Sequence, residues 1–267
     1  MSQEVQEIVQ KLSDFAKLHE IKSIFIIGEY CRKHYLNQLS EINSINVVSA
    51  YHEQAMQLGG LFISEVLDCT PTFYERTGTV SAEYNGIKIE FQGDSIHSYI
   101  KNEEVKTWMQ QKNIEDIPLM NNIYGRDFTI NSLVYSLYTG SMYDPTKRAI
   151  HDFERKVIKS LLPSNLLIKY NPIAALEAVR LALKYEFFID PDLRIAIKEF
   201  GTDNLLKAFT EERIVREVVN ILEIDAEEGL KFLQKLDLSR ILSYPEIKEY
   251  IFEGSKKNAK NSNSSTA

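Results

Sequence analysis

The side chains that most often bind metals or act as nucleophiles are few and scattered in this sequence. The two cysteines, Cys31 and Cys69, are too isolated for a disulfide framework or a thiolate zinc site. The histidines show no HExxH spacing; they are His19, His34, His52, His97 and His151. We therefore predict two reduced thiols and no metal site built from sulfur or imidazole.

The first half of the chain alternates between short apolar runs and helical patterns. Residues 3–19 have apolar residues at three-and-four spacing, which predicts a helix. A strand is expected at 23–27, and Gly28 then leads into a second helix. A strand at 45–50 and a helix from Tyr51 to about Leu58, closed by Gly59-Gly60, follow.

Residues 71–91 alternate around Asn85-Gly86, which is a strong hairpin signal. From Arg126 onward the apolar spacing changes to long helical periods, including FTINSLVYSLY, with breaks at Asp-Pro pairs and at Gly201. We predict an α+β protein with a mixed sheet and helices at 1–145, an all-helical part at 146–253 and a disordered polar tail at 254–267.

Charge and hydropathy limit the classes of partner. Residues 1–150 hold 13 basic and 19 acidic residues, whereas residues 151–267 hold 18 and 19. This balance argues against broad, nonspecific nucleic-acid binding by the first part. The N-terminal stretch lacks an apolar signal segment, and no apolar run approaches the length of a membrane span. We predict a cytoplasmic protein that binds neither membrane nor DNA.

Three ordered segments carry a specific resemblance: GRDFTINSLVYSLYTGSMYDP, IHDFERKVIKS and NPIAALEAVRLALKYEFFIDPDL. They closely resemble the consensus of class II tRNA nucleotidyltransferases and bacterial poly(A) polymerases, and the resemblance extends over roughly residues 20–245. It implies a nucleotidyltransferase head followed by a helical neck. It also implies two-metal transfer of a nucleotide to an RNA 3′ end, in which carboxylates hold Mg²⁺.

The family's metal-binding aspartate pair is missing. The apolar pattern of its strand aligns with Ser44 to Val48, which puts Ser44 and Asn46 at the two aspartate positions. The only nearby acidic residue is Glu41, and the third family carboxylate is matched by Glu90. Glu90 has an alternative interpretation as a solvated strand residue. One carboxylate cannot offset two divalent ions, so no metal cofactor is expected.

Other family motifs have changed as well. The phosphate-binding turn keeps Gly28 and Arg32 but has Glu29 and Lys33 at family-specific positions. The base-reading segment now runs from Tyr170 to Ala174, with Asn171 and Ala174 at the positions of its Asp and Arg. The next helix keeps Arg180.

The RRD motif survives as Arg126-Asp127, and Asn131 of the same motif is also retained. The resemblance implies contact between Asp127 and the nucleotide sugar. The alternative is structural, because Asp127 could cap a helix and Asn131 could bond to backbone groups.

We therefore predict a catalytically inactive homologue that binds RNA, such as a tRNA-like molecule, or a protein such as an active family member. A modest basic cluster either binds RNA or is ordinary solvated charge. Its residues are Lys147, Arg148, Arg155, Lys156 and Lys159. The alternative is an active nucleotidyltransferase with relocated or partner-supplied Mg²⁺ ligands. A third hypothesis is a sensor that binds nucleotide without metal.

Overall fold

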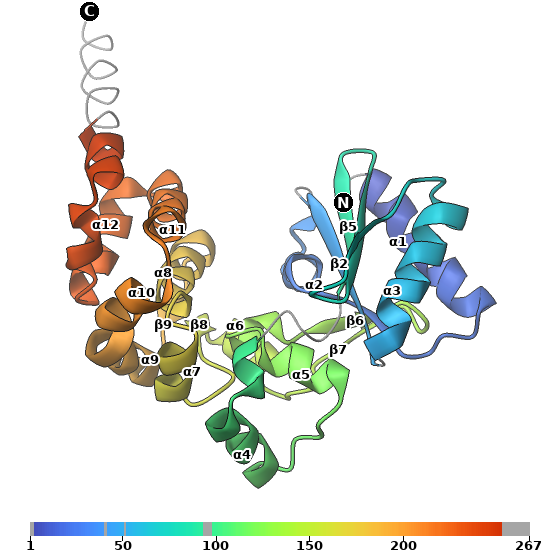
Figure 1. Cartoon of the computed structure of the whole chain (residues 1–267), viewed down its shortest axis with the longest axis horizontal. Coiled ribbons are helices and arrows are strands. Elements are labelled where there is room, and N and C mark those ends of the chain that lie inside the picture. Colours follow the sequence, from blue (N-terminus) through green and yellow to red (C-terminus); the bar gives the residue numbers. More distant parts are fainter. Residues whose placement is uncertain (1–2, 40–41, 51, 93–97, 253–267) are drawn as a thin grey trace, which may run out of the picture. The chain divides into compact units, whose positions relative to one another are not determined.

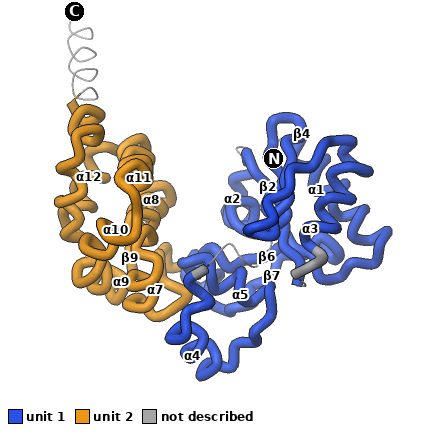
Figure 2. Tube along the Cα trace, in the orientation of Figure 1, with its two compact units in different colours: residues 1–153 blue, residues 154–267 orange. Residues whose placement is uncertain are grey.

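The computed structural model describes residues 3–39, 42–50, 52–92 and 98–252. It divides into two compact units, residues 1–153 and 154–267 (Figure 2). The division lies at the end of helix α6 (Ala149–Glu154), whereas the sequence placed the boundary just before this helix, at 145/146. The predicted disordered tail at 254–267 lies outside the described residues.

Unit 1 is built on a seven-stranded mixed sheet (Figure 1). Its strand order is β3-β4-β5-β2-β1-β6-β7. The strands are β1 (Ile24–Ile27), β2 (Ser44–Ser49), β3 (Thr72–Tyr74), β4 (Thr79–Tyr84), β5 (Ile87–Gln92), β6 (Val134–Ser136) and β7 (Ser141–Tyr143). Neighbouring β2 and β5 run parallel, and the other pairs of neighbours run antiparallel. The predicted mixed sheet is confirmed.

The Asn85-Gly86 hairpin is confirmed between β4 and β5. Both turn residues have positive φ, 52° at Asn85 and 75° at Gly86, as a tight turn between right-twisted strands requires. The closing pair is Tyr84 with Ile87. This turn fixes the register of β5 and therefore decides which of its side chains face the core.

The helices of unit 1 are α1 (Gln3–Leu18), α2 (Glu29–Tyr35), α3 (His52–Leu61), α4 (Glu103–Gln111), α5 (Pro118–Tyr124) and α6, with a π-helical turn η2 (Phe62–Val66) and short 3-10 turns η4 (Ser98–Lys101) and η5 (Thr129–Asn131). Helix α3 packs on the face of the sheet that carries Val80 and Phe91. Figure 1 shows α1 and α3 near one another, and the ring of Phe62 contacts both Phe15 of α1 and Phe91 of β5. The apolar residues of β2 and β5 are thereby buried.

Two local predictions are wrong. Gly59-Gly60 does not end a helix, since α3 runs through both glycines into η2. Gly59 is required inside the helix because a side chain there would collide with Val80 and Phe91. The stretch after Arg126 is not helical either. It forms η5 and then β6, which pairs with β1 through contacts such as Phe25 with Ser136. Pairing with an open strand edge outweighs the local apolar period.

Unit 2 is mainly helical, as predicted. It contains α7 (Ser164–Tyr170), α8 (Ala174–Tyr185), α9 (Pro191–Ala196), the π-helical η6 (Ile197–Gly201), α10 (Thr202–Ala208), α11 (Glu211–Ile224), α12 (Ala226–Lys235) and the 3-10 turn η7 (Ser239–Ser243). A short parallel pair, β8 (Val157–Ile158) and β9 (Phe188–Ile189), is an addition to the expected pattern. Helix α8 packs against both α11 and α12.

Substitution of Gly59 tests the close packing of α3 on the sheet. An added Cβ would lie 2.6 Å from Phe91 Cγ, so Gly59→Ala should lower the free energy of unfolding of unit 1 by about 1–3 kcal/mol. The fluorescence of Trp108, the single tryptophan, reports on this unit during chemical denaturation.

Gly60→Ala is the matched control. Its Cβ would meet only the half-exposed ring of Phe73, which can move, and alanine is favoured over glycine in a helix by roughly 0.5–1 kcal/mol. Equal stability of the two variants would contradict the packing argument.

Candidate functional site

The polar face of β2 and β5 carries the residues at the family's carboxylate positions. Parallel pairing places Asn46 beside Glu90 and Ser44 beside Lys88. The side-chain amide of Gln92 bridges this face, because its nitrogen donates to Asn46 Oδ1 at 3.1 Å and to Glu90 Oε1 at 2.8 Å. Glu90 also forms an ion pair with Lys88 and is only 17% exposed. Glu90 is therefore not a freely solvated strand residue.

The guanidinium of Arg126 completes this network. Its Nη2 donates to Gln92 Oε1 and its Nε donates to Asn122 Oδ1, each at 3.0 Å. Burial, followed by the nearby charge of Arg32, lowers the pKa of Arg126 to about 10, which still leaves it cationic at neutral pH. Within the described part of the chain, its hydrogen-bond acceptors are neutral amides and it forms no ion pair.

Arg32 and Asn131 join the network from α2 and η5. Arg32 Nη1 donates to Asn131 Oδ1 at 2.8 Å, and Asn131 Nδ2 donates to the carbonyl oxygen of Arg126 at 2.9 Å. The expectation that Asn131 bonds to a backbone group is thus confirmed. The same amide holds the two arginines, Arg32 and Arg126, close together.

Asp127 does not cap a helix. Its φ is +61°, a left-handed conformation that is uncommon for a residue with a side chain, and its carboxylate accepts from Tyr99 Oη at 2.7 Å. The residue that precedes η5 is Phe128, and no side chain caps that turn. The capping interpretation is therefore wrong, and Asp127 is a buried carboxylate beside the two arginines.

Gly28 brings the phosphate-turn remnant against this network. Its φ is +76°, and an added Cβ would lie 3.1 Å from Arg126 Nη1 and 3.7 Å from Asn46 Nδ2. A glycine is required for both reasons. The altered turn residues pair with each other, since Lys33 Nζ lies 3.3 Å from Glu29 Oε1. Lys33 is buried, and Glu29 supplies a carboxylate to its ammonium group.

The residues expected at the family's base-reading positions lie in unit 2. Asn171 ends α7 and Ala174 begins α8. Ala174 is completely buried, so this position offers no polar group to a ligand. Arg180 of α8 lies 3.8 Å from Glu217 of α11, and this contact ties the two helices together.

The residues present do not fit a pair of Mg²⁺ ions. Around Asn46 they offer one carboxylate, Glu90, whose oxygens already face Lys88 and Gln92. Two divalent ions need several anionic oxygens, and amides supply none. Among the described residues, no group of three His, Cys, Asp or Glu side chains could hold a metal. Glu41 lies outside them.

Three functional neighbours escaped the sequence analysis. Gln92 lies two residues beyond Glu90 on the same strand face, so strand alternation could have found it. Asn122 and Tyr99 come from α5 and η4, and no spacing connects them to the motif residues. Both cysteines are free, as predicted, and burial raises the pKa of the Cys31 thiol to about 12.

Comparisons with known proteins show which family this sequence matches. The profile of the Poly A polymerase head domain matches residues 24–159. The mitochondrial CCA tRNA nucleotidyltransferase of Saccharomyces cerevisiae is 32% identical over 96 residues, covering 36% of this chain and 17% of that protein. Poly(A) polymerase I of Salmonella typhimurium is 29% identical over 145 residues, covering 51% and 30%.

A solved structure shares the fold. The Thermotoga maritima CCA-adding enzyme complexed with tRNA matches with a TM-score of 0.72 at 18% identity, covering 91% of this chain and 53% of that one. The head domain and its polar strand face define a nucleotidyltransferase-like protein. The chain belongs to the class II tRNA nucleotidyltransferase and poly(A) polymerase family. The matched region spans under two thirds of these relatives, so their whole activities do not carry over by similarity alone.

Substitution of Gln92 tests whether the amide network stabilises unit 1. Gln92→Leu keeps the volume but removes the hydrogen bonds that Gln92 makes with Arg126, Asn46 and Glu90, so unfolding of unit 1 should become easier by about 1–3 kcal/mol. Denaturation followed through Trp108 measures this change. The control is Gln111→Leu on the exposed end of α4, which should leave stability within roughly 0.5 kcal/mol. A Gln92 variant as stable as this control would contradict the network.

Proposed function

We propose that this protein is a catalytically inactive member of its family that acts by binding RNA. The observation that carries the proposal is the amide network at the former metal position. Asn46 Oδ1 and Glu90 Oε1, two oxygens in the neighbourhood where metal ligands are expected, both accept from Gln92. A divalent ion there would have to displace these hydrogen bonds and would gain one carboxylate in return.

Electrostatics support the loss of metal chemistry. With Ser44 and Asn46 in place of two carboxylates, the hydrogen-bond acceptors of Arg126 among the described residues are neutral amides. Burial lowers the pKa of Arg126, and the nearby carboxylate of Asp127 acts to raise it. The site therefore holds its positive charge on protein side chains, Arg32 and Arg126. Two further cations placed beside them would meet repulsion in a partly buried environment.

The alternative function is a working RNA nucleotidyltransferase with relocated or partner-supplied ligands, adding CMP or AMP to RNA 3′ ends. One observation favours it: the retained residues of the family lie in one network. Arg32, Arg126 and Asn131 are hydrogen-bonded together, Asp127 adjoins them, and Gln92 links Glu90 to Arg126.

A transfer assay separates the two functions. The pure chain, incubated with Mg²⁺ or Mn²⁺, labelled CTP and ATP, and tRNA lacking its 3′ CCA, should give no labelled RNA, because no carboxylate set remains to activate the 3′-hydroxyl. An active family enzyme provides the positive control. Labelled product that is lost in Glu90→Ala but kept in Glu83→Ala, an exposed carboxylate on the neighbouring strand, would refute the inactive assignment.

A phosphate-bearing ligand remains compatible with this site without metal. Arg126 lies against Gly28, Asn131 joins Arg126 to Arg32, and the hydrogen-bond acceptors of Arg126 among the described residues are neutral amides. This arrangement supports the binding of a nucleotide or an RNA terminus through its phosphates.

Titration of ATP in EDTA tests this binding. Saturable binding is expected by calorimetry, and Arg126→Gln should weaken it about tenfold, or ~1.4 kcal/mol, because a charged donor is lost. The matched control, Lys159→Gln, removes a cation that pairs with Asp190 in unit 2 and should have no effect. Binding that appears only with Mg²⁺ added would contradict the prediction.

RNA is the favoured partner because solved relatives with this fold are complexed with tRNA. Calorimetric titration with an active family member would reveal a protein partner instead. No helix among the described residues is long and apolar enough to cross a membrane. A cytoplasmic location is part of the proposal, and the curated relatives include mitochondrial enzymes.

A further inference from the structure

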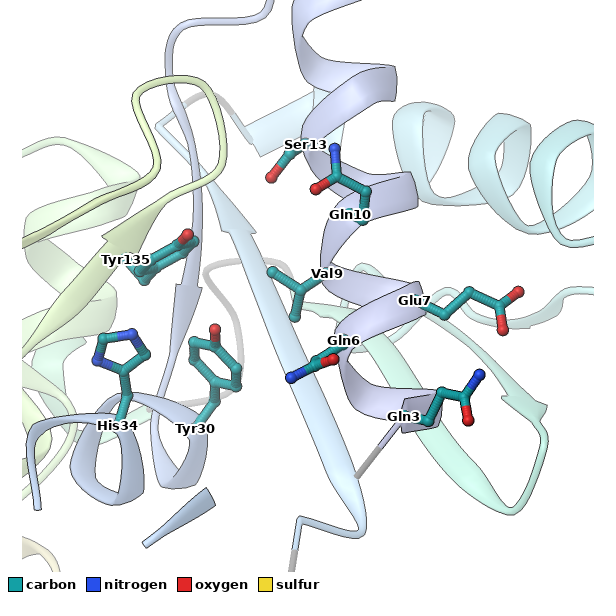
Figure 3. Close-up of a pocket in the computed structure, with 9 residues that line it drawn as sticks. All are labelled: Gln3, Gln6, Glu7, Val9, Gln10, Ser13, Tyr30, His34 and Tyr135. Atoms are coloured by element: carbon teal, nitrogen blue, oxygen red, sulfur yellow. The ribbon is translucent and has the colours of Figure 1, made fainter. Parts of the chain in front are cut away.

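A cavity lies in unit 1, and its lining contains none of the residues of the amide network. Its volume is about 570 Å³, which is within the range of small-molecule sites. Figure 3 shows α1 along one side of it, with residues of α2 and β6 on the other. The lining residues are Gln3, Gln6, Glu7, Val9, Gln10, Ser13, Tyr30, His34 and Tyr135.

One wall of this cavity is aromatic. The rings of Tyr30, His34 and Tyr135 contact one another, with centroid distances of 5.5 to 5.7 Å and tilts of 43° to 70°. Each ring therefore restricts the rotation of the other two. His34 and Tyr135 are partly exposed, so the wall presents a preformed π surface.

The wall carries no charge at neutral pH. Burial raises the pKa of Tyr30 and of Tyr135, and it lowers the pKa of His34, so the phenols and the imidazole are all neutral. The lining contains no lysine or arginine. Its one carboxylate, on Glu7, points away from the rings in Figure 3; it accepts from Tyr84 Oη at 3.1 Å and lies 3.6 Å from Lys11 Nζ.

Two hydroxyls of largely buried residues line the cavity. Tyr30 is 2% exposed and Ser13 is 7% exposed. Neither hydroxyl has a hydrogen-bond partner among the described residues, and neither is sealed from solvent. Both hydroxyls are therefore free to bond to a ligand in the cavity.

The wall formed by α1 supplies carboxamides. Gln6 points toward the aromatic side in Figure 3. Gln10 Nε2 donates a hydrogen bond to Asp14 Oδ1 at 2.8 Å, which leaves the amide oxygen of Gln10 available. A carboxamide pairs in two places with the edge of a nucleobase such as adenine, and aromatic rings stack on the face of a base.

We propose that this cavity binds an uncharged nucleobase, held by the rings and read by Tyr30, Ser13 and the glutamines of α1. The absence of basic side chains from its lining means that phosphate stays outside. The base comes either from a free nucleoside or from an unpaired nucleotide of single-stranded RNA. The proposal does not depend on the inactive assignment, because none of the lining residues belongs to the amide network.

Calorimetric titration of the full chain with adenosine in EDTA tests the proposal. Saturable binding of one adenosine is expected, and Tyr30→Phe and Ser13→Ala should each weaken it about tenfold, because each removes one hydroxyl and almost no volume. Tyr74→Phe, on the exposed strand β3, is the matched control and should bind as the unchanged chain does. Gln6→Ala, at an exposed position, gives a second test in which folding is not at risk.

A short single-stranded oligoadenylate, titrated in parallel, identifies the source of the base. Tighter binding of the oligonucleotide with the same sensitivity to Tyr30→Phe indicates RNA, and equal or weaker binding indicates a free nucleoside. Arg126→Gln should leave adenosine binding unchanged, which separates this site from the phosphate site. Absence of adenosine and oligonucleotide binding, survival of binding in Tyr30→Phe and Ser13→Ala, or displacement by inorganic phosphate would overturn the proposal.

Discussion

The parallel pairing of β2 with β5 is the constraint on which the polar site depends. Its register sets Asn46 beside Glu90, and the hairpin at Asn85-Gly86 fixes that register from the other side of β5. A slip of β5 by one residue would turn Glu90 and Gln92 into the core and expose the apolar residues between them. The site therefore has the same rigidity as the core beneath it.

On this frame Ser44 and Asn46 stand where the family has an aspartate pair. Two arginines, Arg32 and Arg126, remain, and neutral amides stand around Arg126. The amides satisfy the hydrogen bonds of the guanidinium but do not neutralise its charge, which is why its pKa is lowered by burial and by Arg32. An anionic ligand, with its own negative charge, complements such a site better than a cation does.

The incorrect sequence predictions have a common physical origin. A glycine pair commonly ends a helix, but α3 needs Gly59 for close approach to Val80 and Phe91. The apolar spacing after Arg126 is typical of a helix, but β1 offers these residues an open edge and β6 forms there. An aspartate at position 127 suits a helix cap, yet its carboxylate accepts from Tyr99. In each case a partner distant in sequence outweighs the local signal.

The sequence by itself determined the family, the mixed sheet, the helical second unit and the loss of the aspartate pair. These follow from apolar periodicity, turn residues and the identity of a few side chains, all of which are local. Only the tertiary structure decided that Gln92 bridges Asn46 and Glu90, that Asn131 joins the two arginines, and that Tyr30 and Ser13 face one cavity. Hydrogen bonds between residues far apart in the chain depend on strand register and helix packing, which no local pattern specifies.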